Sequence, residues 1–483
     1  MNNKSIKYKK SQSGRHYGLA LLFSVTSFIC AIIAINDPPQ GIYVYLPMVT
    51  IVFGILTMFF FQIFKNMTFV TIIVYAFMYL RYTVTLFMLH IERYPRGVYN
   101  ISIDSGASLR TALTMIFEML MIFLALYVSR RKYHENVTID EYRKRVLDRD
   151  NFSSLNVLTV LFIIVTVILF AMYPALFTNY SFIFSHNLDS LTDTIISSQA
   201  SLPSGFRWIG YTFGEVTRYI LIEYFVLRMY KRYSGSEIKK SRYWVLSVIL
   251  VTLNALITNQ RMMLGIFISL ALFYQIYQLF PEKRHFFIGF VGTLGVGAFL
   301  VITITYWINA LSYQSFSQML QGYTNGFYNV YQAHNAYRNA NMGFLDRLSM
   351  FFIGDGLGNV NVVSMFINSI NSSDIYNFYI YGQEFNGGAV LPFVSQMSFY
   401  FSVFIGPVFS YLIIMLAKKI ENRSINSTGN LLITQFCAFV FAATPFMYNY
   451  STDIHILTVV ALPIWLLAKI NSKNIVLGRA SRL

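Results

Sequence analysis

The sequence is poor in charged residues and almost devoid of cysteine. Of its 483 residues, 12% are charged and 55% are hydrophobic, with a mean hydropathy of +0.51. Soluble domains carry about 25% charged residues, so this composition predicts an integral membrane protein. The only two cysteines, Cys30 and Cys437, each lie inside an apolar run, which excludes a disulfide framework and a thiolate metal site.

Several catalytic signatures are also missing from the sequence. It contains no glycine-rich phosphate loop, no HExxH pair, no Cys/His metal pattern and no convincing carboxylate dyad. Their absence disfavours energy input from ATP and a transition-metal mechanism. We therefore expect neither a metal nor an organic cofactor.

Long apolar runs are abundant. Runs of about 18 to 23 residues can cross a hydrocarbon core of about 30 Å as helices. The predicted fold is an all-α polytopic membrane protein with about twelve transmembrane helices. These lie at Tyr17–Ile35, Ile42–Phe64, Met67–Leu89, Leu109–Val128, Leu155–Phe177, Phe206–Leu227, Tyr243–Ile257, Met262–Phe280, Phe286–Ile308, Val390–Leu416, Leu431–Met447 and Ile454–Ala468. The first run follows basic residues without a small-residue cleavage site, which predicts an anchor rather than a signal peptide.

The distribution of Lys and Arg predicts the orientation of these helices. With the N-terminus inside, roughly 28 of the 37 basic residues fall in the N-terminal segment, the even-numbered gaps and the C-terminal tail. This positive-inside pattern places both termini in the cytoplasm. The formal net charge of +16 then reflects topology, and nucleic acid is not an expected partner.

The longest hydrophilic interruption divides the chain into three predicted segments. Residues 1–308 hold transmembrane helices 1–9 with short loops, 309–389 form a large extracytoplasmic loop, and 390–483 hold helices 10–12 and a cytoplasmic tail. A structureless loop of about 80 residues would be unusual, so we expect a folded or partly re-entrant cap with short helices. The working surface is therefore predicted on the outer face.

A set of arginines falls on this predicted outer face. Arg261 occupies a gap of two or three residues between apolar runs, where a positive charge is disfavoured, and this cost indicates a function. Arginine binds phosphate oxygens bidentately, and two or three such bonds of roughly 1.5–3 kcal/mol each would anchor a pyrophosphate. Each loop arginine could instead lie at the membrane interface or pair with Asp346 or Asp355. The other members of the set are Arg207, Arg338 and Arg347, with Arg93, Arg96 and Arg110 nearby.

A second set of ionisable residues lies inside the apolar runs. At 100° per residue, four of them share an arc of about 160° on the helix predicted at Phe206–Leu227. Such a face either lines a substrate cavity or forms ion pairs with another helix, and Arg81 and Glu118 are candidate partners. The four residues on the arc are Arg207, Glu215, Arg218 and Glu223.

The segment Tyr331–Arg338 in the long loop combines a histidine, an arginine and tyrosines. His334 and Arg338 are four residues apart and would share one face of a helix. A histidine can accept a proton from a sugar hydroxyl near neutral pH, and tyrosine rings can pack against sugar rings. The alternative interpretation is an ordinary loop histidine.

Three short segments stand out beside the topology. Ala255–Ile266 carries Arg261 in a short turn that an apolar run follows. Val390–Phe409 begins with Leu391-Pro392 and closes the long loop, which itself contains His334-Asn335. With about twelve spans, cytoplasmic termini and a dominant outer loop in the second half, the chain resembles the Wzy-type polymerases of O-antigen, capsule and related repeat-unit polysaccharides over nearly its whole length.

Each segment is similar to a feature of that family. The first resembles a short outer turn with one arginine, although Asn259-Gln260 stands where glycine or serine is usual. The second resembles the span that closes the large loop, and the third is similar to a His-Asn stretch that the related O-antigen ligases share. Arg338 and Gly354 also match an arginine–glycine spacing described for these loops.

The resemblance implies a GT-C-like, lipid-dependent glycosyltransferase in the bacterial cytoplasmic (inner) membrane. Its substrates would be a growing glycan on undecaprenyl pyrophosphate and a single lipid-linked repeat unit, joined with inversion as the lipid pyrophosphate leaves. Arg261, Arg338 and Arg347 are expected at the pyrophosphate, with His334 as the base and Glu384 as a weaker candidate. Further candidates for substrate binding are Arg207, Arg81 and Arg218.

Membrane lipid, and a chain-length regulator and a flippase of the same pathway, are the expected partners. Three other functions remain open. A ligase would transfer finished glycan to another acceptor with similar topology and chemistry. A flippase or exporter of the same lipid-linked sugar would be expected to show internal pseudo-symmetry and balanced loops, and the sequence shows neither. The last is a non-catalytic scaffold for polysaccharide assembly.

Overall fold

The part of the chain that the computed structural model describes is mostly helical and has no β-strand. The structure describes residues 3–94, 104–132, 155–174, 176, 204–233, 237–256, 262–280, 316–360, 363, 370–381, 391–426 and 431–480. Five helices among these residues are long and apolar enough to cross a membrane, at Tyr17–Asn36, Gly41–Phe59, Phe69–Ile91, Ser105–Arg130 and Tyr450–Asn471. The all-α membrane class predicted from the sequence is confirmed. The number of twelve spans stays a prediction, and the run Phe286–Ile308 lies outside the described residues.

Side chains on these helices are arranged for an apolar solvent. On α1 (Asn3–Asn36), Leu22, Ile29 and Ile32 are each at least half exposed. The buried face of α1 carries hydroxyls: Ser24 donates to the Gly54 carbonyl at 2.9 Å, and Ser27 lies 2.8 Å from the Thr83 hydroxyl. Small polar residues between helices and large apolar ones outside are characteristic of helices packed in lipid.

The chain forms two compact units. Unit 1 comprises Met1–His134, Leu294–Lys419 and Ala438–Ile454, and unit 2 comprises Glu135–Thr293, Ile420–Cys437 and His455–Leu483. Each unit therefore draws on several parts of the chain. The predicted segments 1–308, 309–389 and 390–483 were defined by their expected membrane topology and not by compactness. Their placement across a membrane stays a prediction.

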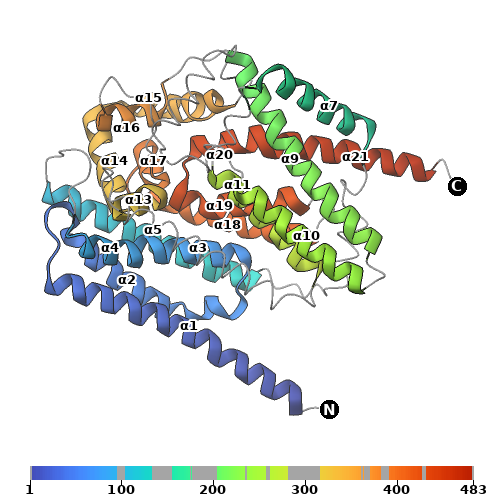
Figure 1. Ribbon diagram of the computed structural model, residues 1–483. Coiled ribbons are helices and arrows are strands. Elements are labelled where there is room, and N and C mark those ends of the chain that lie inside the picture. Colours follow the sequence, from blue (N-terminus) through green and yellow to red (C-terminus); the bar gives the residue numbers. More distant parts are fainter. Residues whose placement is uncertain are drawn as a thin grey trace. The chain divides into compact units, whose positions relative to one another are not determined.

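The first half of unit 1 is built around the membrane-type helices (Figure 1). After α1 come η1 (Gly41–Tyr45), α2 (Leu46–Phe59), η2 (Phe61–Asn66), α3 (Phe69–Tyr79), the π-helical turn η3 (Leu80–Val84), α4 (Thr85–Ile91) and α5 (Ser105–Lys132). Thr68 caps the start of α3, since its hydroxyl accepts from the Thr71 amide, and η3 joins α3 to α4 within one continuous helical run.

The second half of unit 1 begins with short helices. They are α13 (Phe316–Thr324), α14 (Phe327–Ala340), α15 (Phe344–Ser349), the π-helical turn η6 (Met350–Gly354), η7 (Leu357–Asn359) and α16 (Ser372–Tyr381). They lie in the predicted loop 309–389, and none is long enough to be a candidate span. The next helices are α17 (Phe393–Tyr400), α18 (Gly406–Asn426), α19 (Leu431–Met447) and α20 (Tyr450–Ile456). The last three each belong partly to unit 1 and partly to unit 2.

Unit 2 contains the remaining described helices. They are α7 (Val157–Met172), α9 (Ser204–Tyr233), α10 (Glu237–Leu256), α11 (Met262–Leu279), the π-helical turn η9 (Leu457–Ala461) and α21 (Leu462–Ala480). Here too hydroxyls lie inside: Thr166 on α7 is 2.8 Å from the Thr217 hydroxyl on α9, while Val157 and Met172 at the ends of α7 are exposed.

The span predicted at Val390–Leu416 is wrong as a single helix. Helix α17 ends at Tyr400, five residues intervene, and α18 begins at Gly406. A Cβ at Gly406 would lie 2.8 Å from both the Val394 carbonyl oxygen and the Ser398 amide nitrogen, so only glycine allows this close approach to α17. Because the apolar character continues through the break, hydropathy alone did not reveal it.

Candidate functional site

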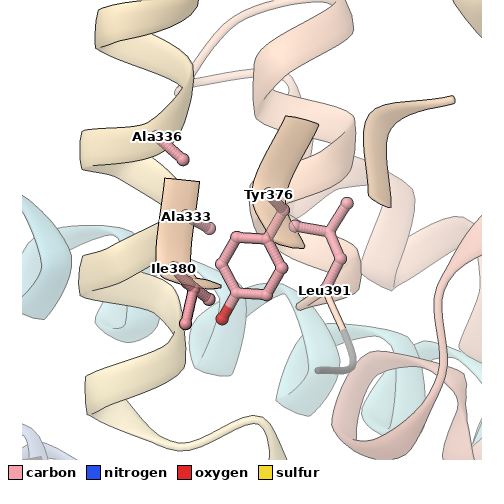
Figure 2. Packing of buried hydrophobic residues seen from close by; sticks show 5 residues of the cluster. All are labelled: Ala333, Ala336, Tyr376, Ile380 and Leu391. Atoms are coloured by element: carbon pink, nitrogen blue, oxygen red, sulfur yellow. The ribbon is translucent and has the colours of Figure 1, made fainter. Parts of the chain in front are cut away.

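Helix α14 brings the histidine and arginine of the long loop together. It ends at Ala340 and is followed by Asn341, which adopts a left-handed conformation with φ 43°. At 100° per residue, Tyr331, His334 and Arg338 fall on one face. On the opposite face, Ala333 and Ala336 pack against α16, as Figure 2 shows with Tyr376, Ile380 and Leu391. The prediction that His334 and Arg338 share a helical face is confirmed.

The face with His334 and Arg338 packs against the N-terminal end of α5. The Tyr331 hydroxyl accepts a hydrogen bond from the Asp104 amide at 3.0 Å, and Arg338 Nη1 lies 3.6 Å from Asp104 Oδ2. The other carboxylate oxygen of Asp104 accepts from the Gly106 amide at 2.9 Å and so caps α5. Two elements distant in sequence thus meet at Asp104.

His334 has an unusual environment. Both ring nitrogens are buried and have no hydrogen-bond partner among the described residues, although the residue as a whole keeps some surface. Burial, together with the positive charge of Arg110 on α5, lowers the pKa of His334 to about 4. The imidazole is therefore neutral at physiological pH, and neither nitrogen uses its hydrogen-bonding capacity within the described residues.

Arg338 is held only loosely by Asp104. Its side chain is 66% exposed and that of Asp104 is 48% exposed. Ion pairs of this kind contribute at most about 1 kcal/mol because water and salt screen them. The guanidinium of Arg338 is consequently free to bind an anion from solution.

Arg347 has a partly structural role. Its Nη1 donates to the Phe399 carbonyl at 2.9 Å, one of the last carbonyls of α17, and its guanidinium lies 5.9 Å from the Phe399 ring centre. Phe399 in turn stacks on Tyr337 of α14 at 4.0 Å. Arg347 thereby holds α15 against the end of α17, whose Phe399 packs on α14, and its guanidinium is half-buried.

Asp355 is a functional candidate that sequence reasoning considered only as an ion-pair partner for arginine. It is fully buried directly after η6, and it accepts hydrogen bonds from the Tyr400 hydroxyl, the Ser451 hydroxyl and, at 3.1 Å, the Ser372 amide. Gln396 links the two serines, donating at 2.9 Å to Ser372 and at 3.2 Å to Ser451. Burial raises the pKa of Asp355. The only sequence signal was an acidic residue between two glycines in an apolar stretch.

Arg81 lies deep in unit 1. It pairs with Glu118 at 2.9 Å, and neither side chain has exposed surface. Ser410 donates to the same carboxylate at 2.9 Å, and Arg81 Nη1 also lies 3.4 Å from the Pro445 carbonyl in the last turn of α19. Arg81 and Glu118 were expected as partners for the polar face of 206–227, whereas the structure pairs them with each other, and this ion pair joins η3, α5, α18 and the end of α19. This placement gives Arg81 a role in packing.

The other candidate binding and catalytic residues belong to unit 2 or lie outside the described residues. Arg218 on α9 donates to the Asn254 carbonyl in the last turn of α10 at 3.2 Å, and its guanidinium lies 5.3 Å from the Tyr219 ring centre. Arg207 is part of α9, but its side chain is not described. Arg261 and Glu384 both lie outside the described residues.

The site at α14 and α5 combines two exposed cations with a neutral base. Arg338 and Arg110 are exposed, and the nitrogens of His334 have no partner among the described residues. Within the same described part, no group of three or more His, Cys, Asp or Glu could hold a metal ion. Such a site can bind a phosphate-class anion and accept a proton beside it. No protein-family model, curated protein or solved structure matches the chain.

Proposed function

We propose that the protein polymerises oligosaccharide repeat units linked to undecaprenyl pyrophosphate on the outer face of the bacterial cytoplasmic membrane. The observation that carries this proposal is the face of α14, where a neutral His334 without a hydrogen-bond partner among the described residues lies with Arg338 and close to Arg110. This face packs against the start of α5, one of the membrane-type helices. Lipid-linked pyrophosphates combine the two properties that such a protein can bind: an apolar tail in the bilayer and a strong anion at its surface.

In the proposed reaction an acceptor hydroxyl attacks the anomeric carbon of the donor. The new C–O bond forms as the bond to the pyrophosphate oxygen breaks, and the lipid pyrophosphate leaves with the electron pair. His334 takes the proton of the attacking hydroxyl. Arg338, with Arg347 on α15, stabilises the charge that develops on the leaving oxygen. Arg261, which the sequence predicts in the same role, lies outside the described residues.

The low pKa of His334 fits this reaction only when the donor is bound. With a pKa of about 4, the imidazole of the free protein is a weak base. A pyrophosphate on Arg338 brings negative charge close to the ring, which favours the protonated form and raises the pKa. The base would thus gain strength at the moment when a leaving group is in place.

The proposal is tested first in a strain that lacks the protein. We expect single repeat units on the outer face and no longer rungs in the surface-polysaccharide ladder, with the lipid-linked pool analysed beside it. Repeat units trapped on the cytoplasmic side would instead show a flippase. Long glycan that accumulates on the lipid without transfer to its final acceptor would show a ligase.

Two substitutions then test the site in the purified, full-length protein. Arg338→Gln should lower the polymerisation rate about 100-fold or more, as loss of a charge-stabilising donor does, and His334→Gln should lower it by about 10²–10⁴, as expected for a general base. Arg228→Gln, at an exposed arginine on α9, is the matched control and should polymerise normally. Normal polymer from both site variants would reject the assignment.

A further inference from the structure

The contact between Asp104 and Arg338 places a carboxylate where an incoming anion would bind. The position of Asp104 is fixed from two sides, because its amide donates to Tyr331 and its Oδ1 accepts from Gly106. Only Oδ2 is directed to Arg338, at 3.6 Å. This oxygen is therefore presented to the guanidinium by the backbone of α5 and does not depend on the ion pair for its place.

The geometry of this ion pair is poor for stabilising the fold. Charge-assisted N–H···O bonds are about 2.7–2.9 Å long, whereas this distance is 3.6 Å, and the side chains of Arg338 and Asp104 are 66% and 48% exposed. Tyr331 already joins α14 to α5 through a better hydrogen bond at 3.0 Å. The ion pair is weak enough for an external anion to replace Asp104 at Arg338.

We propose that Asp104 is a built-in competitor for the anion site of Arg338. A phosphate-class anion displaces its carboxylate on binding, and the carboxylate returns to Arg338 when the anion leaves. Asp104 thereby weakens the binding of the pyrophosphate and speeds its release. The identity of the natural anion rests on the proposed function, but the competition itself is a property of Asp104 and Arg338.

Asp104→Asn separates the charge of this residue from its structural role. Asparagine caps a helix N-terminus as well as aspartate does, so α5 keeps its start. Binding of inorganic pyrophosphate to the full-length protein in detergent at low salt, measured by calorimetry, should be about two- to fivefold tighter in the variant, which is the range that exposed ion pairs support. The difference should shrink at high salt, because the competing charge is exposed.

Two further variants make the test specific. In an Arg338→Gln background the added Asp104→Asn change should have little effect, because the competition needs Arg338. Asp346→Asn removes another exposed carboxylate, on α15, and should leave pyrophosphate binding unchanged. An Asp104→Asn effect that persists without Arg338, a gain equally large in Asp346→Asn, or no measurable binding to wild type and Asp104→Asn alike would overturn the proposal.

Failure of this proposal and failure of the proposed function give different results. If Asp104→Asn binds pyrophosphate more tightly while the wild-type protein makes no polymer, the competition holds and the polymerase assignment fails. If the wild type makes polymer, the variant should show a lower KM for the lipid-linked donor without a higher kcat. Polymer formation with an unchanged KM and unchanged pyrophosphate binding would reject only the role of Asp104.

Discussion

His334 is the residue at which burial and charge act in the same direction. Both the loss of water and the nearby Arg110 disfavour the imidazolium, which lowers the pKa from 6.5 to about 4. Between these values the unfolded chain binds more protons than the folded one. The stability that the neutral imidazole contributes is thus fully present above about pH 6.5 and is lost as the pH falls towards 4.

The difference between the pKa of His334 in the folded and the unfolded chain predicts that the unfolding free energy depends on pH. Wild-type protein in detergent should lose up to about 3 kcal/mol of stability from this residue between pH 6.5 and 4, and His334→Gln should lose less over the same interval. The raised pKa of Asp355 makes the unfolding free energy change with pH in the opposite direction. Because Asp355 is present in both proteins, its contribution cancels when the two are compared. Thermal unfolding from pH 7.5 to 4 measures the effect, with His90→Gln as the matched control. Parallel profiles for wild type and His334→Gln would contradict the environment described for this ring.

Local sequence spacing was sufficient to predict part of this site. The four-residue separation of His334 and Arg338 predicts their common face on any helix, and α14 is that helix. Asp104 could not be found in this way, because it lies 227 residues before Tyr331, to which it is bonded. A contact of this kind depends on how α14 packs against α5, and it cannot be predicted from the residue spacing within either helix.

At the scale of elements, Asp355 joins the short helices of the predicted loop to the C-terminal helices of unit 1. Its three hydrogen-bond donors come from α16, α17 and α20. The chain reaches Asp355 through η6, where a Cβ on Gly354 would collide with the Ile370 carbonyl oxygen. A glycine followed by a buried carboxylate therefore fixes this turn against the start of α16.

Removing the Asp355 carboxylate should loosen these three helices together. Asp355→Ala leaves Tyr400, Ser451 and the Ser372 amide without their acceptor in a buried place, which costs about 2–5 kcal/mol of unfolding free energy. A lower melting temperature of the purified protein would measure this loss. Asp346→Ala, at an exposed carboxylate, should change stability by less than about 0.5 kcal/mol. Equal melting temperatures for the two variants would show that the network does not support the fold.

Helix boundaries were harder to predict than helix content. The apolar run at Val390–Leu416 exceeded the length of one span, yet it forms two helices separated by Phe401–Ile405. Gly406 and Pro407 did mark the start of a helix, since proline is tolerated in the first turn. Hydropathy measures only how apolar a stretch is, and both helices and the turn between them are apolar here.

At the scale of the whole molecule, composition determined the class of protein, and the structure confirms it in the way that side chains are distributed. Exposed Leu and Ile on α1 with serines inside are the reverse of a soluble helix. The buried ion pair of Arg81 and Glu118 is also consistent with an apolar lipid surrounding, because a charge inside an apolar environment needs a partner. Which face of the membrane each loop occupies follows from the Lys and Arg distribution alone, and it stays a prediction.

The proposed reaction requires that α14 and its neighbours lie on the outer face, and the chain is well suited to a direct test. Replacing Cys30 and Cys437 by alanine removes both native thiols, after which single cysteines report their own side of the membrane. Ser349 on α15 and Lys419 on α18 are both exposed. In intact spheroplasts a membrane-impermeant maleimide should label Ser349→Cys, whereas Lys419→Cys should react only after permeabilisation.

Labelling after permeabilisation is the control that both cysteines are reactive. The opposite pattern would place α14, α15 and His334 in the cytoplasm, where roughly 28 basic residues are predicted to lie. A polymerase that uses lipid-linked units on the outer face could not work from that side, because polar sugars and a charged pyrophosphate do not cross the bilayer unaided. That single result would reject the proposed function while leaving the competition between Asp104 and an anion at Arg338 open to its own measurement.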